Sequence, residues 1–254
     1  MIEDALRTFG PFIALGLAGL LVLHRLEAEV FGAAEYDETR DGSRPSLRRR
    51  LSWYVVGVLL IAAVVWAHPD PGGELHLQLG DRLAAVVLGF AYAAIGTAQA
   101  IAFAWWRYRR IRLPSVGSYP DALANAVATA FIDEAAFRGV VLGFAVMFVG
   151  AAGRDPILAV LISALVYVLV TRAAARGRPI YTLYLTFGIG MLSGWLTLAT
   201  GGIGAAFLGH AITRFAVFLC TGHAGSVTRP GTEVEEIERK RRPPDGWRVV
   251  GHRS

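Results

Sequence analysis

The sequence predicts an all-α, polytopic membrane protein of about seven transmembrane helices, and three observations support this fold class. Of the 254 residues, 54% are hydrophobic, and the mean hydropathy of +0.47 exceeds that of ordinary soluble domains. Apolar runs recur at lengths near the ~20 residues that a helix needs to cross a bilayer. Arginines fall in every second connection between these runs. We therefore expect an integral membrane protein, with the lipid bilayer as its first partner and a bacterial plasma membrane as its location.

The seven predicted spans follow one another along the chain at residues 9–25, 51–67, 82–106, 121–148, 156–171, 180–200 and 203–222. They make residues 1–222 one transmembrane helical domain, which leaves 223–254 as a charged tail. The acidic start of the chain, residues 1–4, lacks the basic region of a cleaved signal peptide, so we expect the first span to be retained. Asp121 is the expected N-cap of the fourth span.

The distribution of arginines predicts the orientation of the helices. Three connections are basic, and they contain Arg40, Arg44, Arg48, Arg49 and Arg50, then Arg107, Arg109, Arg110 and Arg112, then Arg172, Arg176 and Arg178. The other connections are poor in basic residues, so the basic ones should be cytoplasmic. This pattern places the N-terminus outside and the C-terminal tail in the cytoplasm. The formal net charge of +5 therefore indicates no nucleic-acid partner, since the basic residues are not gathered on one soluble face.

Cofactor signals are weak in this sequence. Cys220 is the single cysteine, which excludes an intrachain disulfide and a cysteine-cluster metal site. The connection at 67–76 contains His68, Asp70, Glu74 and His76, but their spacing matches no strong ligand pattern, and an ordinary exposed loop is favoured. We expect no cofactor and assign no metal ligands, although a divalent metal stays open.

Three ionisable residues lie in the middle of the fourth span: Asp133, Glu134 and Arg138. A charge at the bilayer centre costs roughly 2.5–3.5 kcal/mol, so such residues mark a functional site by default. Glu134 and Arg138 are four residues apart and share a helix face, where an ion pair would lower the cost of burying both. Asp133 lies about 100° around the helix. We expect it to have less local compensation and to be the more available acid.

The last span supplies His210 and Arg214, which are also four residues apart. An imidazole near the bilayer midplane should project into the bundle, because acids and histidine need each other as partners in hydrocarbon. There His210 could hydrogen-bond a water molecule held by the acids or stabilise an oxyanion.

The run from Asp133 to Gly139, Asp-Glu-Ala-Ala-Phe-Arg-Gly, resembles the Glu-Glu-x-x-Phe-Arg-Gly signature of the CPBP (Abi) family of intramembrane endopeptidases. That family includes the type II CAAX prenyl endopeptidases. The resemblance extends over about 121–220 and implies that the first acid activates a water molecule for attack on a peptide carbonyl. It places the family's two acids on Asp133 and Glu134, and its arginine on Arg138.

Two later family motifs are altered in this chain. Where the family has Phe-x-x-x-His, this sequence has Tyr167 and Thr171, and threonine carries no proton near neutral pH. Where the family has His-x-x-x-Asn, His210 is kept and Arg214 replaces asparagine, which adds a fixed cation facing the acids. Aspartate at 133 is also one methylene shorter than glutamate. Each change should weaken the family's usual mechanism.

The resemblance favours a membrane-embedded endopeptidase-like protein that acts on a peptide or prenylated (CAAX-type) protein substrate by carboxylate-activated water. The alternative is a catalytically inactive family member, a pseudoenzyme that serves as a membrane scaffold or partner-binding protein through a buried acid, histidine and arginine network. A small proton-relay transporter is a third reading, which the absence of internal repeats disfavours. Convergence of Asp133 and Glu134 with His210 would favour the enzyme, and bidentate occupation of an acid by Arg214 would oppose it.

Overall fold

The computed structural model of the chain describes residues 2–33, 47–109, 111, 116–174, 180–221 and 238. The charged tail predicted at 223–254 lies outside these residues except for Glu238, and so do several arginines used to predict the orientation: Arg40, Arg44, Arg110, Arg112, Arg176 and Arg178. The division into a helical domain and a tail therefore stays a prediction, as does the placement of the termini relative to the bilayer.

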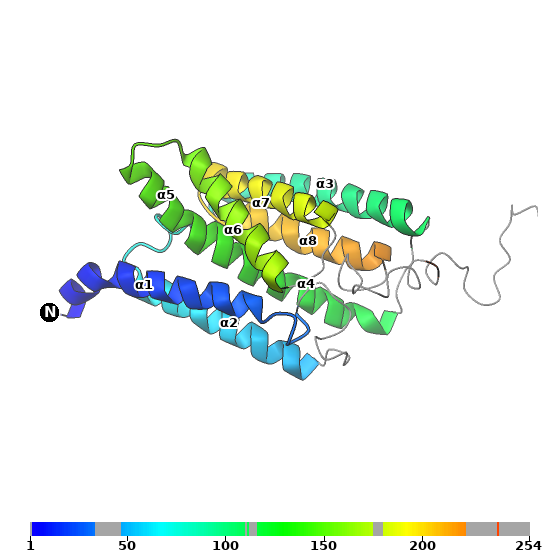
Figure 1. The fold of residues 1–254 in the computed structure, drawn as a ribbon, viewed down its shortest axis with the longest axis horizontal. Helices are drawn as coiled ribbons and strands as arrows, with labels where there is room; N and C mark the ends of the chain where they lie inside the picture. Colours follow the sequence, from blue (N-terminus) through cyan, green and yellow to red (C-terminus); the bar gives the residue numbers. More distant parts are fainter. Residues whose placement is uncertain are drawn as a thin grey trace, which may run out of the picture.

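The described residues are all-helical. In chain order the elements are α1 (Ile2–Leu26), α2 (Leu47–Ala67), α3 (Arg82–Tyr108), the short 3-10 helix η1 (Val116–Ser118), α4 (Tyr119–Asp133), the π-helix η2 (Glu134–Val141), α5 (Leu142–Ala151), α6 (Pro156–Ala174), α7 (Ile180–Thr200) and α8 (Gly204–Thr221). Figure 1 shows that α4, η2 and α5 form one continuous rod.

Seven helices in the described part of the chain are long and apolar enough to cross a membrane, which confirms the predicted fold class. The fourth of them is the rod from Tyr119 to Ala151, 33 residues long. It begins before the predicted boundary because Pro120, whose fixed φ suits the first turn of a helix, lies ahead of Asp121. Asp121 is consequently inside the first turn, and its prediction as the N-cap is wrong. Its carboxylate still favours the helix by lying near the positive end of the helix dipole.

Local capping explains where two of the other helices begin. The Asp81 carboxylate accepts a hydrogen bond of 2.8 Å from the backbone N–H of Ala84 and so caps α3. Asp155 accepts one of 2.8 Å from the N–H of Ile157, directly ahead of Pro156 at the start of α6. These hydrogen bonds fix the residues at which α3 and α6 begin.

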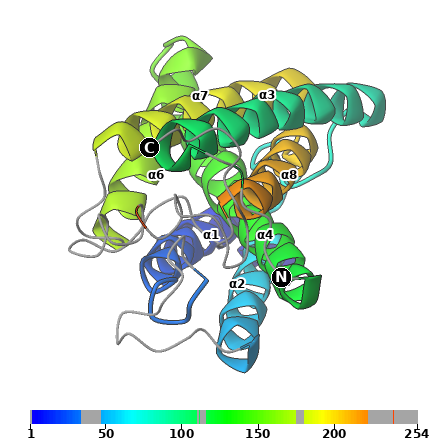
Figure 2. The ribbon, with the colours of Figure 1, turned by 90° about the vertical axis from the view of Figure 1, so that its right-hand side faces the viewer.

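The rod of α4, η2 and α5 lies at the centre of the bundle. The α1–α2 pair packs on one side of it, and α3, α7 and α8 gather on the other, as both views show (Figures 1 and 2). Helices α3 and α8 are in especially close contact, because a side chain at Gly89, Gly96 or Gly209 would overlap atoms of the facing helix. At Gly209 the overlapping group is the ring of Tyr92. This close packing positions the helix face that carries His210.

The surface and the interior have the polarity expected of a protein in lipid. Large apolar side chains project outward from the helices, for example Phe12, Leu59, Leu83 and Phe148. Several charged and polar side chains are instead buried inside the bundle, among them Arg25, Asp133, Glu134, Arg138, His210 and Arg214. The protein is an integral membrane protein whose ionisable groups face one another rather than the hydrocarbon.

Candidate functional site

The acids of the site lie at the junction where α4 changes into the π-helix η2. Asp133 is the last residue of α4, Glu134 is the first of η2, and both side chains are fully buried. A π-helix leaves a backbone group without its usual α-helical partner, and here Ser163 on α6 donates a hydrogen bond of 2.6 Å to the carbonyl of Phe137. This bond ties α6 to the segment that presents Glu134.

Glu134 has two charged or ionisable partners. Its Oε1 lies 2.6 Å from Nδ1 of His210, and its Oε2 lies 3.4 Å from Nε of Arg138. A carboxylate only accepts hydrogen bonds, so Nδ1–H of the imidazole donates, and in the neutral ring Nε2 keeps its lone pair. Arg138 also stacks on Tyr167, with its guanidinium carbon 4.1 Å from the ring centroid. The predicted ion pair of Glu134 with Arg138 is present, and His210 meets an acid directly.

Asp133 is held by a different pair of cations. Arg25 on α1 donates through Nε to Oδ1 at 2.5 Å and through Nη2 to Oδ2 at 3.4 Å. Arg214 on α8 lies on the other side, with Nη1 3.8 Å from Oδ2. The expectation that Asp133 has less compensation than Glu134 is therefore wrong, because a helix distant in sequence supplies a bidentate arginine. The two acids, adjacent in the chain, belong to separate ion pairs.

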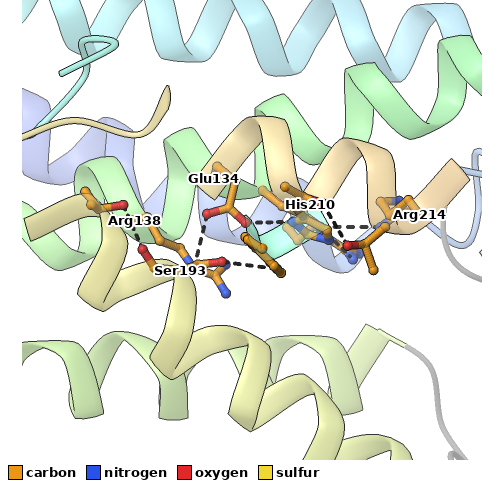
Figure 3. Close-up of polar contacts among 11 residues, drawn as sticks. Glu134, Arg138, Ser193, His210 and Arg214 are labelled. Atoms are coloured by element: carbon orange, nitrogen blue, oxygen red, sulfur yellow. Dashed lines mark hydrogen bonds and ion pairs between the residues drawn. The ribbon is translucent and has the colours of Figure 1, made fainter. Parts of the chain in front are cut away.

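Figure 3 shows the order of the labelled groups across the site. In that view His210 lies between Glu134 and Arg214, and Arg138 lies on the far side of Glu134. Asp133 and Glu134 do not converge on His210 as one pair, since only Glu134 contacts the imidazole. The bidentate occupation of an acid that would oppose the family's usual mechanism is made by Arg25, whereas Arg214 makes a single longer contact.

Thr171 and Tyr167 share one face of α6, because they are four residues apart. The Tyr167 ring packs on Phe137 with 4.9 Å between ring centroids. The hydroxyl of Thr171 is buried and has no hydrogen-bond partner. The structure thus keeps Tyr167 in an aromatic packing role against η2, while Thr171 contributes an unsatisfied hydroxyl at the position where the family has histidine.

A second set of buried polar groups follows the same face of α4 toward its first turn. Thr129 and Asn125 are one and two turns before Asp133, and all three are buried. Asn125 accepts a hydrogen bond of 2.6 Å from the hydroxyl of Tyr54 on α2, and the Thr129 hydroxyl donates to the Asn125 carbonyl. Polar side chains therefore extend from the acids toward the end of the bundle where α4 begins.

Sequence reasoning missed Arg25, the most closely bound partner of the site. It lies in the last turn of α1, 108 residues before Asp133, and outside the motifs. Its neighbour His24 has a different role, with Nε2 3.0 Å from the carbonyl of Trp53 and the ring stacked on the Trp53 side chain. The one signal in the sequence was a cation at the end of an apolar run, which is also the ordinary sign of an interface anchor.

No group of three or more histidine, cysteine, aspartate or glutamate side chains within the described ranges is arranged to hold a metal ion. In the loop between α2 and α3, His68 approaches Glu74 at 3.5 Å, and its Nδ1 accepts from the backbone N–H of Asp70. The site that the residues do form is an acid–imidazole pair, Glu134 with His210, beside an acid fixed between two guanidinium groups. The Glu134–His210 pair can transfer a proton, whereas Asp133 is held in ion pairs with Arg25 and Arg214.

The fold and this site define the class: a polytopic helical membrane protein with an acid, histidine and arginine network buried in the bundle. Residues 115–216 match the model of the family described as type II CAAX prenyl endopeptidase Rce1-like. The resemblance carried by the motif at Asp133–Gly139 is thereby confirmed over this segment. The match includes α4 to α7 and most of α8 but not α1, so Arg25 lies outside it. Searches of curated proteins and of solved structures found no match.

Proposed function

We propose that the chain is a membrane-embedded endopeptidase that hydrolyses a peptide bond in a peptide or prenylated (CAAX-type) protein, in a bacterial plasma membrane. The observation that carries this proposal is the 2.6 Å contact between Glu134 Oε1 and His210 Nδ1 inside a fully buried site. The likeness of residues 115–216 to the type II CAAX prenyl endopeptidases supports the substrate class.

In the proposed mechanism Glu134 fixes the tautomer of His210, and His210 Nε2 takes the proton from a water molecule. The oxygen of that water attacks the peptide carbonyl, and His210 returns the proton to the departing amine. The products are a carboxylate and an amine. The buried Nη groups of Arg138, which make no hydrogen bond, are suitable donors for the oxyanion. This assignment moves the role of base from Asp133, which two arginines hold, to the Glu134–His210 pair.

The test uses full-length protein in lipid nanodiscs and a prenylated reporter peptide. Glu134→Gln should abolish turnover and leave the fold intact, since the amide still accepts from the imidazole but no longer supports a charged one. Asp121→Asn is the matched control, because it makes the same carboxylate-to-amide change at an exposed position of the same rod. Turnover that survives Glu134→Gln would refute the mechanism.

Asp133→Asn separates this mechanism from the family's usual one. If Glu134 and His210 form the base, Asp133→Asn should retain measurable turnover in the molecules that stay folded. If Asp133 activates the water, turnover should vanish in that variant. Activity is normalised to folded protein, because Asp133 is also the partner of Arg25.

A second candidate function is a catalytically inactive family member that serves as a membrane scaffold or partner-binding protein. The clamp of Arg25 and Arg214 on Asp133 favours it, since an acid held in this way is a structural group. In that case wild-type protein should show no turnover of any reporter. Glu134→Ala should then act on stability alone, with a loss of roughly 3–5 kcal/mol from the unpaired charges that it leaves.

A further inference from the structure

Three guanidinium groups, those of Arg25, Arg138 and Arg214, face two carboxylates, those of Asp133 and Glu134. Two of the guanidinium groups, those of Arg25 and Arg214, share the carboxylate of Asp133. A buried cation without a close partner is costly, so the guanidinium group with the weaker contacts matters.

The weaker contacts are those of Arg214. Arg25 has both of the short contacts with Asp133. Arg138 pairs with Glu134 and is also stacked on an aromatic ring. Arg214 has only the 3.8 Å approach to Asp133, and its two Nη atoms are buried and make no hydrogen bond. Only 8% of its side chain is exposed, so more than nine-tenths of the side chain lies inside the bundle. The four N–H bonds of its two Nη atoms have no hydrogen-bond acceptor.

The position of Arg214 relates this cation to the proposed chemistry. Arg214 lies one helical turn beyond His210 on the same face of α8, a rise of about 5.4 Å. From there the buried polar groups Asn125 and Tyr54 lead toward the end of the bundle where α4 begins. A ligand that reaches the Glu134–His210 pair from that end passes Arg214 first.

We propose that Arg214 is a substrate-binding residue that recognises a carboxylate of the substrate close to the bond that is cleaved. A guanidinium group whose two Nη atoms make no other hydrogen bond can bind a carboxylate through two parallel hydrogen bonds. An extended chain advances about 3.3–3.6 Å per residue, so a separation of about 5.4 Å places the carboxylate within roughly two residues of the bond at His210. The carboxylate is either the free end of the peptide or an Asp or Glu side chain.

This inference rests on the proposed peptidase function, and the experiment separates the two by measuring binding as well as turnover. Three N-acetylated peptides share one apolar sequence: the first ends in a free carboxylate, the second in an amide, and the third in an amide with one Glu added near the end. Each is titrated against full-length protein in nanodiscs of zwitterionic lipid.

We expect the first or the third peptide to bind about tenfold to a hundredfold more tightly than the plain amide, the range of one charged hydrogen-bonding interaction. The peptide that gains affinity identifies the source of the carboxylate. Arg214→Gln should remove the preference, and Arg214→Lys should keep part of it, since lysine retains the charge and loses the planar fork. Arg154→Gln, in the exposed loop after α5, is the matched control and should leave the preference unchanged.

Equal affinity for all three peptides, or the absence of binding by any of them, would overturn the assignment of Arg214. Retention of the preference in a folded Arg214→Gln variant would overturn it as well. If carboxylate peptides bind preferentially but are never cleaved, the binding site stands and the peptidase function fails. If peptides are cleaved without any preference, the function stands and the binding site fails.

Discussion

The contrast between Asp133 and Arg25 gives the sharpest prediction about stability. Asp133→Asn removes the carboxylate that Arg25 contacts through both Nε and Nη2 and that Arg214 approaches at 3.8 Å. Removing one partner of a buried ion pair costs about 3–5 kcal/mol in free energy of unfolding. Because both Arg25 and Arg214 lose this carboxylate, we expect a loss at the upper end of this range.

Arg25→Met should cost less than Asp133→Asn, although it breaks the same ion pair. Arg214 remains 3.8 Å from Asp133, and at an effective dielectric constant of about 20 this contact is still worth about 4 kcal/mol of Coulomb energy. In this variant Asp133 keeps Arg214 as a cationic partner, and Glu134 keeps Arg138. We expect a loss of about 1–2 kcal/mol, less than a full buried pair.

Reversible unfolding in mixed detergent micelles measures these free energies. The double variant Arg25→Met/Asp133→Asn should be more stable than the sum of the single losses predicts, with a coupling of about 0.5–3 kcal/mol. Asp121→Asn is the exposed control and should change stability by no more than about 0.5 kcal/mol. The reasoning is refuted if Arg25→Met costs as much as Asp133→Asn, or if the two losses add without coupling.

Three further predictions concern groups around the site. Gly209→Ala should lower the free energy of unfolding by about 1–3 kcal/mol, because the new Cβ overlaps the Tyr92 ring, whereas Gly188→Ala meets nothing and should be nearly neutral in the same unfolding titration. Ser163→Ala should cost about 1–3 kcal/mol by leaving a buried π-helix carbonyl unpaired, and circular dichroism with unfolding would reveal a smaller effect if that carbonyl finds another partner. Burial lowers the pKa of His76 below its usual value of 6.5. As the pH drops below about 6.5, the unfolded state therefore binds a proton more readily than the folded state, and the free energy of unfolding should fall. His76→Gln should flatten this pH dependence, and an unchanged pH profile would count against the prediction.

The number of helices and the chemical type of the site could be predicted from the sequence, since each depends on local patterns. Apolar runs of sufficient length define the seven spans. The meeting of Glu134 with His210 also followed from a simple rule, because ionisable side chains in hydrocarbon must find one another. A spacing of four residues placed Arg138 beside Glu134 in the same way.

The partner of Asp133 could not be predicted from these patterns. Arg25 belongs to a helix 108 residues away, and at the end of an apolar run it is indistinguishable from an interface anchor. The change from α4 to the π-helix at Glu134 was also not evident from the sequence. In the π-helix, Ser163 of another helix donates a hydrogen bond to the backbone carbonyl of Phe137. Both features come from tertiary contacts and determine which acid is free to act.

The location of Arg25 also bears on how the chain enters the membrane during synthesis. The last turn of α1 is followed directly by the charged residues Glu27 and Glu29, so while α1 stands alone its arginine can reach polar headgroups at little cost. The central rod has no such option, since its two acids and arginine lie far from both ends. When that rod emerges from the ribosome, α1 is already in the bilayer and presents the counter-charge. Because synthesis proceeds from the N-terminus, Arg25 enters the membrane before Asp133, the acid with which it pairs.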